Sequence, residues 1–290
     1  MRNYDIMKEI IMGKEGVPLN ILESLVYGFV AGISEIMPIS SKAHRYIIGN
    51  LLGAQQYDPI LNALVTISVL ISALSGISGI LEQLRRSSRS RIHTRGSYTQ
   101  NAGLLRFFKN AILPMLVVYF ILYYWTDAST SYLTIAVCLL INGIALFIPG
   151  RMIQGNKTAV HMSLLDSLLA GISGALSALP GFSGTGMMTS VLVVRGTQRQ
   201  RAFQWSLVLL LPLMAASVFT DVLTLFALGG HIVFATNFFG YIFAIVGGYL
   251  GGYLGVFLMR TMIARSDFTG FAYYCWGASM FAFLLYLIVV

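Results

Sequence analysis

The sequence predicts an all-α polytopic membrane protein with six transmembrane helices and two re-entrant helical hairpins in an inverted-topology repeat. Three observations lead to this prediction: an excess of apolar residues, six apolar runs of membrane length, and two apolar regions that are interrupted. The chain is 57% hydrophobic and 10% charged, whereas a soluble domain carries about 25% charged residues. We therefore expect most of its surface to face a bilayer.

The net charge of +8 does not point to a nucleic-acid partner here. A basic soluble domain would suggest nucleic acid, but in this chain the basic residues stand between apolar runs. That placement is typical of loops that anchor membrane helices. The two cysteines lie inside apolar segments and indicate neither a metal site nor a disulfide framework.

The predicted elements come in two similar sets along the chain. An interrupted region over 20–53, broken by Pro38 and a Ser-Ser-Lys cluster, precedes three apolar runs. A second interrupted region over 162–195, broken by Pro180 and several glycines, precedes three more. Irregular backbone at membrane depth is tolerated only where protein buries it or water reaches it, so we interpret both regions as re-entrant hairpins. At 1.5 Å per residue, these six runs can cross the membrane: 58–84, 108–126, 131–149, 202–227, 233–259 and 269–289.

Loop charges orient these elements. With six spans and two re-entrant hairpins, every basic connection falls on one side, which the positive-inside rule makes cytoplasmic. The predicted basic cytoplasmic loop is 85–107, and both termini are expected outside the plasma (inner) membrane. The basic residues on the cytoplasmic side include Arg85, Arg86, Arg89, Arg91, Arg95, Arg106, Arg151, Lys157, Arg195, Arg199, Arg201, Arg260 and Arg265.

The chain is expected to form a single membrane domain, 1–290, of two inverted repeats over about 20–149 and 162–289. Three spans are an odd number, so the two halves must have opposite orientations. The sequence Ala-Gly-Ile-Ser at 31–34 recurs at 170–173, which is a weaker sign of the same repeat. Inverted repeats with broken helices place a polar site near the midplane, where the hairpins meet.

The first hairpin carries polar side chains that are expensive at membrane depth: Ser34, Glu35, Ser40, Ser41, Lys42, His44 and Arg45. A carboxylate, two hydroxyls, a cation and an imidazole within ten residues are sufficient for nucleophilic attack with acid–base assistance. The alternative is structural: Ser40 and Ser41 would cap the second half-helix and His44 would lie at the interface.

The second hairpin contains Pro-Gly-Phe-Ser-Gly-Thr-Gly at 180–186. Glycines and hydroxyls before a helix can bind phosphate through backbone N–H groups and the positive end of the helix dipole. A glycine-rich bend for close helix packing is an equal alternative. Asp166, near the start of this hairpin, is expected to cap or pair within it.

The two motifs resemble those of the undecaprenyl-pyrophosphate phosphatase family. Residues 32–44 are similar to its first signature, Gly-Leu-Thr-Glu-Phe-Leu-Pro-Val-Ser-Ser-Thr-Gly-His, and residues 180–186 to its second, Pro-Gly-x-Ser-Arg-Ser-Gly. The resemblance extends in topology over nearly the whole chain. It implies removal of a phosphate from a C55 isoprenoid diphosphate at the outer membrane face, which regenerates the lipid carrier for cell-wall precursors.

The resemblance also implies roles for individual residues. Ser41 would be the nucleophile, and His44 and Glu35 would handle protons or a divalent cation, Mg²⁺ or Ca²⁺, with Glu35 as its ligand. The substrate, a polyprenyl diphosphate or phosphate lipid, would be bound by Ser40, Lys42, Ser183, Thr185, Gly184 and Gly186.

Several positions depart from the family pattern. The usual leading glutamate is Ala31, the second-motif arginine is Gly184, a glutamine before that motif is Gly174, and a later glutamate is replaced by Gln204. These losses remove groups that would hold a pyrophosphate and its metal. We therefore expect Lys42 to supply the missing positive charge, as a point donor without the fork of arginine.

These departures leave other functions open. A lipid-phosphate transporter or flippase is the alternative to the phosphatase, because paired broken helices are also transporter architecture. A third reading is a paralogue that binds a lipid or partner without chemistry. A homodimer is left open as well.

Overall fold

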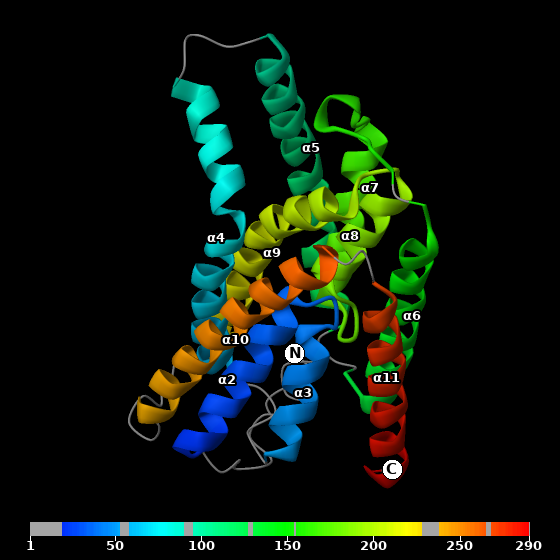
Figure 1. Cartoon of the computed structure of the whole chain (residues 1–290). Helices are drawn as coiled ribbons and strands as arrows, with labels where there is room; N and C mark the ends of the chain where they lie inside the picture. The colour runs from blue at the N-terminus through cyan, green and yellow to red at the C-terminus, as the bar shows by residue number, and fades with distance from the viewer. Residues whose placement is uncertain are drawn as a thin grey trace.

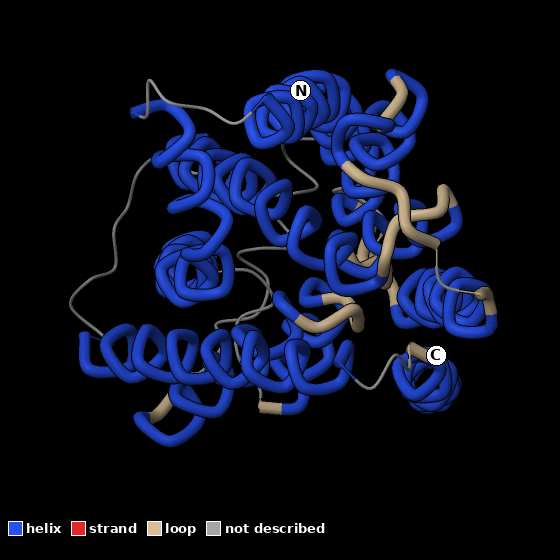
Figure 2. Tube along the Cα trace, turned by 45° about the horizontal axis from the view of Figure 1, so that its top comes forward, coloured by secondary structure: helices blue, strands red, loops and turns tan. Residues whose placement is uncertain are grey.

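The computed structural model describes residues 19–52, 58–89, 95–126, 130–153, 155–227, 238–264 and 268–289. Within these ranges the chain is helical, and the only β-type pairing is an isolated parallel bridge between Lys157 and Thr197. Figure 2 shows helices joined by short connections throughout these ranges. The all-α prediction is confirmed.

Six long helices in the described part of the chain are apolar enough to cross a membrane. The shortest, α6, has 20 residues and reaches about 30 Å, the thickness of a hydrocarbon core. The six predicted spans are thus confirmed as α4 (Pro59–Arg89), α5 (Arg95–Thr126), α6 (Tyr132–Arg151), α9 (Arg199–Ala227), α10 (Phe238–Ala264) and α11 (Thr269–Val289).

Two of these helices extend into the segment that was expected to be a basic loop, 85–107. Helix α4 continues to Arg89 and α5 begins at Arg95. Arginine, leucine and glutamine favour helix, and no proline interrupts either end. The basic residues of this segment are therefore largely on helix ends that extend beyond the apolar spans.

The shorter helices form two hairpins. The first consists of α2 (Ile21–Ile36) and α3 (Ser41–Leu51), and the second of α7 (Leu164–Ala175) and α8 (Gly184–Val194). Two 3₁₀ turns, η1 (Ala159–His161) and η2 (Leu176–Ala178), flank α7. Helices α3 and α8 have 11 residues each, or about 16 Å, which is too short to cross a bilayer.

The hairpins approach from opposite ends of the molecule. In Figure 1, α2 and α3 run between the lower end and the centre, and α7 and α8 between the upper end and the centre. Their tips touch, since the Gly181 amide donates to Ser40 Oγ at 3.0 Å. This arrangement is consistent with re-entrant hairpins, and the inverted repeat stays a prediction.

Close backbone packing holds the first hairpin against α10. A Cβ at Gly28 or Gly32 would collide with backbone atoms of Ala244 or Gly248. Small residues allow membrane helices to approach this closely, and the gain is van der Waals contact along the whole interface. The position of α2, and hence of its tip, is therefore set by α10.

An ionic cluster fastens the open end of the second hairpin. The fully buried Asp166 accepts from Lys157 Nζ and from Arg195 Nε, each at 2.5 Å. It also forms a capping box with Ser163 at the start of α7. Burial alone would raise the pKa of the Asp166 carboxyl, but the hydrogen bonds from Lys157, Ser163 and Arg195 hold it far below its usual range. The expected capping and pairing role of Asp166 is confirmed.

Candidate active site

The tip of the first hairpin is a strained turn. Helix α2 ends before Met37-Pro38, and Ser40 then adopts φ 69° and ψ 101°, a left-handed conformation that is uncommon for a residue other than glycine. Ser40 Oγ accepts from the Ala43 amide at 3.4 Å and the Gly181 amide at 3.0 Å. These bonds cap α3 and join the two tips, so Ser40 is used in tip packing.

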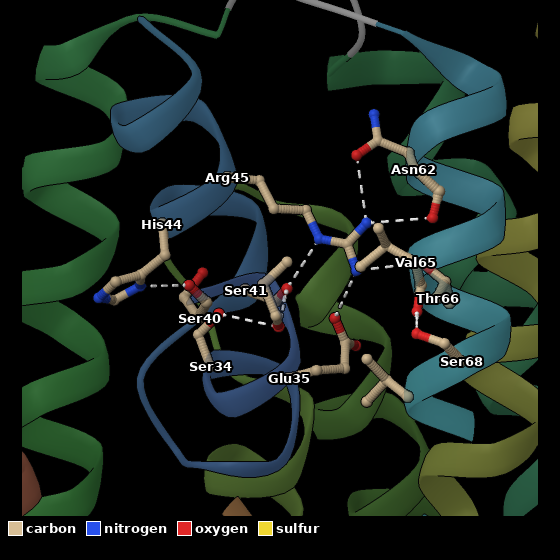
Figure 3. Close-up of polar contacts among 12 residues, drawn as sticks. Ser34, Glu35, Ser40, Ser41, His44, Arg45, Asn62, Val65, Thr66 and Ser68 are labelled. Carbon is tan, nitrogen blue, oxygen red and sulfur yellow. Dashed lines mark hydrogen bonds and ion pairs between the residues drawn. The ribbon is translucent and has the colours of Figure 1, made fainter. Parts of the chain in front are cut away.

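Ser41, the first residue of α3, is buried beside the tip, with 8% of its surface exposed. Its hydroxyl donates to the Ala31 carbonyl at 3.3 Å and accepts from Arg45 Nε at 3.0 Å (Figure 3). The proton and one lone pair of Ser41 Oγ are therefore both directed by neighbouring groups.

Arg45 is the centre of the polar network, and it had no assigned role in the sequence prediction. Its guanidinium donates to Ser41, to the carbonyl and side chain of Asn62 at 3.3 and 3.2 Å, and to Thr66 at 3.0 Å. The helical spacing of four from Ser41 was a usable signal, because residues four apart share a face. Asn62 and Thr66, polar residues in an apolar span, were a second signal.

Glu35 lies against the same guanidinium. Its carboxylate is 3.5 Å from Arg45 Nη2, and its side chain is 21% exposed. The structure thus brings Glu35, Ser41 and Arg45 together, as Figure 3 shows. Across the described ranges, no three His, Cys, Asp or Glu side chains gather closely enough to hold a metal ion.

His44 points to the opposite side of α3 (Figure 3). Its Nδ1 lies 2.7 Å from the Ser40 carbonyl and its Nε2 lies 2.7 Å from Tyr274 OH on α11. A carbonyl only accepts, so Nδ1 carries the proton and, in the neutral ring, Nε2 accepts from the tyrosine. The structure therefore does not bring His44 to Ser41 and Glu35.

Lys42 reaches the other hairpin, and its expected contact with a phosphate stays a prediction. Its Nζ donates to the Ala178 carbonyl at 2.8 Å. It also lies over the rings of Tyr119 and Tyr123 on α5, 5.4 and 5.5 Å from their centroids. Cation–π contacts of this kind stabilise an ammonium away from water.

The hydroxyls of the second motif face the first tip. Ser183 Oγ and Thr185 Oγ1 donate to the Met37 carbonyl at 3.3 and 3.4 Å, and both residues are buried. Ser183 Oγ also accepts from the Gly186 amide at 3.2 Å and so caps α8. The motif is placed in tip-to-tip packing, and a phosphate contact for these residues stays a prediction.

Two further features explain why this packing needs its particular residues. A Cβ at Gly186 would lie 2.8 Å from Pro38 Cβ, so glycine is required there, whereas at Gly184 the nearest atom is the Ser177 side chain at 3.3 Å. Asn142 on α6 joins both tips, since it donates to the Pro38 carbonyl at 3.1 Å and accepts from the Ser183 amide at 3.0 Å. The sequence prediction missed Asn142, although an amide in an apolar span was a signal for it.

Comparison with known proteins is informative over most of the chain. Residues 24–281 match the family model described as bacitracin resistance protein BacA. Undecaprenyl-diphosphatase 1 of Shouchella clausii is 24% identical over 92% of this chain and 96% of its own length. The undecaprenyl-diphosphatase of Methanococcus maripaludis is 25% identical over 90% and 98%. That of Saccharolobus solfataricus is 29% identical over 70% and 74%.

Proposed function

The chain belongs to the bacitracin resistance protein BacA family, and on this premise we propose that it is a membrane undecaprenyl-diphosphate phosphatase. The observation that carries the proposal is the setting of Ser41. Its hydroxyl is buried in the centre of a membrane protein, between the Ala31 carbonyl and the Arg45 guanidinium. The transporter alternative is not favoured, because the relatives are named as diphosphatases.

In the proposed first step, Ser41 Oγ forms a bond to the terminal phosphorus of the diphosphate. The bond from that phosphorus to the bridging oxygen breaks, and the isoprenoid monophosphate leaves with the bonding electrons. In the resting site the Ser41 hydroxyl donates to the Ala31 carbonyl, and we assign its proton during attack to the Glu35 carboxylate, which contacts the same Arg45 guanidinium. Water then attacks the phosphoserine phosphorus and keeps its hydrogens on the released inorganic phosphate, while Glu35 returns its proton to Ser41 Oγ.

A divalent cation, Mg²⁺ or Ca²⁺, belongs to the proposal only as a partner of the substrate. Mg²⁺ often binds through one or two carboxylates together with substrate phosphates. Glu35 could supply one such oxygen, at the expense of its pairing with Arg45. The cation would neutralise phosphate charge, and the remaining ligands would come from the diphosphate and water.

The orientation of the molecule is part of the same proposal. We place the basic ends of α4, α5 and α9 in the cytoplasm, on the basis of the positive-inside rule. The open end of the first hairpin then faces the outside of the plasma membrane, the side that the resemblance implies for the substrate.

The test is phosphate release from undecaprenyl diphosphate by the purified full chain in detergent, with and without Mg²⁺ or Ca²⁺. Ser41→Ala should lower the rate by about a thousandfold or more, as loss of a nucleophile does. Ser24→Ala is the matched control, since Ser24 is buried in α2 and its hydroxyl has no hydrogen-bond partner in the described chain. Release that survives Ser41→Ala, or no release from folded wild-type protein, would overturn the proposal.

A further inference from the structure

We infer that Arg45 is the positioning residue of this site: it orients Ser41, stabilises negative charge on the Ser41 oxygen, and is itself held too tightly to bind substrate. The inference rests on the proposed function for its consequence in catalysis. The contacts of the Arg45 guanidinium, from which we draw it, are present whether or not the reaction takes place.

The Arg45 charge lies in a largely buried position. The Arg45 side chain is 12% exposed and stands among helices that face apolar surroundings. Placing a cation there is expensive unless charge and hydrogen bonds compensate it. Glu35 supplies the opposite charge, and α3 and α4 supply the hydrogen-bond acceptors.

The N–H donors of Arg45 all face acceptors within the protein. A guanidinium has five N–H groups in a fixed plane, and the structure gives Arg45 five acceptors. Nε donates to Ser41 Oγ, Nη1 faces both oxygens of Asn62, and Nη2 faces Thr66 and Glu35. A phosphate could bind Arg45 only by displacing one of these partners. We therefore assign it a role through Ser41 and Glu35, without direct contact to the diphosphate.

The Arg45 guanidinium acts on the Ser41 oxygen through a charged hydrogen bond. A charged donor binds an oxygen more strongly as that oxygen becomes negative, and a donor that is already in place costs no rearrangement during the reaction. The 3.0 Å bond from Arg45 Nε meets this condition at the atom that is proposed to attack. It would supply activation that His44, turned toward Tyr274, is not placed to supply.

The acceptors of Arg45 are themselves held in place by neighbouring helices. Asn62 Oδ1 accepts from Tyr27 OH at 2.8 Å as well as from Arg45. Tyr27 is on α2, Asn62 and Thr66 are on α4, and Arg45 is on α3. The guanidinium therefore joins three helices, and its planar fork suits this better than the single point charge of lysine.

Steady-state kinetics of Arg45 variants give the first test. Arg45→Gln should lower kcat about a hundredfold, the usual effect of losing one preorganised donor, and leave KM within about twofold. Arg45→Lys should recover part of kcat, because the charge returns without the fork. Arg260→Gln is the matched control, since Arg260 donates to the Ser75 and Gly76 carbonyls on α4, outside the site. A raised KM with unchanged kcat would show substrate binding and overturn the inference.

A second test does not depend on phosphatase activity. In Ser41→Cys protein, the rate of alkylation by iodoacetamide is measured against pH, with wild type as the background for Cys138 and Cys275, which are both buried. A guanidinium beside the sulfur favours thiolate, so adding Arg45→Gln should move the midpoint of the rate curve to higher pH by about one unit or more. Equal midpoints would overturn the inference, even if phosphate release had confirmed the proposed function. A shifted midpoint in a protein that releases no phosphate would support the contact between Arg45 and residue 41 and would contradict the proposed phosphatase activity.

Discussion

The two hairpins meet at their tips, yet only the first carries charged side chains there. The first has Glu35, Lys42 and Arg45 at or beside its tip. The second has uncharged residues throughout 176–190, and its charges, Asp166 and Arg195, pair at its open end. The turns differ in backbone strain as well. The positive φ falls on Ser40 in the first hairpin and on Gly181 in the second, and only glycine adopts such a φ at little cost.

This difference indicates a division of work. Strain and buried charge concentrate where function requires them, and both are found at the first tip. The hydroxyls of the second tip donate to the Met37 carbonyl of the first. We interpret the first hairpin as the reactive element and the second as the brace that holds its turn. The following predictions test that division, from the largest expected effect to the smallest.

Paired serine substitutions give the sharpest contrast. Ser41→Ala should reduce phosphate release by about a thousandfold or more, whereas Ser183→Ala should stay within about tenfold of wild type. Loss of the Ser183 cap on α8 should lower stability by about 1 kcal/mol. Both effects are measured by phosphate release and thermal unfolding in the same detergent. Equal loss of activity in the two variants would place chemistry on both hairpins.

Gly186→Ala tests whether the brace must touch the first tip. The new Cβ would lie 2.8 Å from Pro38 Cβ, so the tips must separate or the helices must shift, at a cost of about 1–3 kcal/mol. We expect a lower unfolding temperature and a reduced kcat. Gly277→Ala on α11 is the matched control, since nothing lies within 4 Å of its Cβ position. If Gly186→Ala behaves like Gly277→Ala, tip contact is not needed.

Asp166→Asn tests the open end of the brace. The neutral amide removes both ion pairs but keeps one oxygen as a hydrogen-bond acceptor, and we expect a stability loss of about 2 kcal/mol with a smaller effect on activity. The folded-state pKa of Asp166 is depressed, so its stabilisation is complete above the unfolded value of about 4 and is lost as pH falls toward the folded value. As the pH is lowered from 7, the unfolding temperature should therefore fall less steeply in the variant than in the wild type. Parallel curves would contradict the assignment.

The smallest effect is expected where the first hairpin contacts α11. His44 Nε2 and Tyr274 OH lie 2.7 Å apart, so His44→Gln and Tyr274→Phe should each reduce stability and be coupled. A double-mutant cycle should give a coupling energy of about 0.5–1 kcal/mol. Additive effects would show that this hydrogen bond contributes nothing to the position of α3.

Much of the fold could be predicted from composition and from the prolines and glycines that interrupt apolar regions. Hydrocarbon thickness fixes the length of a spanning helix, so the apolar runs gave six spans. Unsatisfied backbone is excluded from lipid, so Pro38 and Pro180 in apolar regions gave two hairpins. The ends were less predictable, because α4 and α5 continue past the apolar boundary as arginine-bearing helices. The polar cluster around Ser41 was also predictable, because charged residues are rare inside apolar membrane segments.

Partner choice inside the cluster depended on the tertiary structure. Local sequence placed Ser41, Lys42, His44 and Arg45 within five consecutive residues of one helix, but it could not say which neighbouring helix each side chain would face. The answer depends on contacts between distant segments: Lys42 with Ala178, His44 with Tyr274, and Arg45 with α4. Sequence by itself determined which elements form and that the first tip bears the charge, because solvation by lipid acts on each residue separately. Only packing decided that Arg45 faces Ser41 and His44 does not, because that depends on how separate helices are arranged around α3.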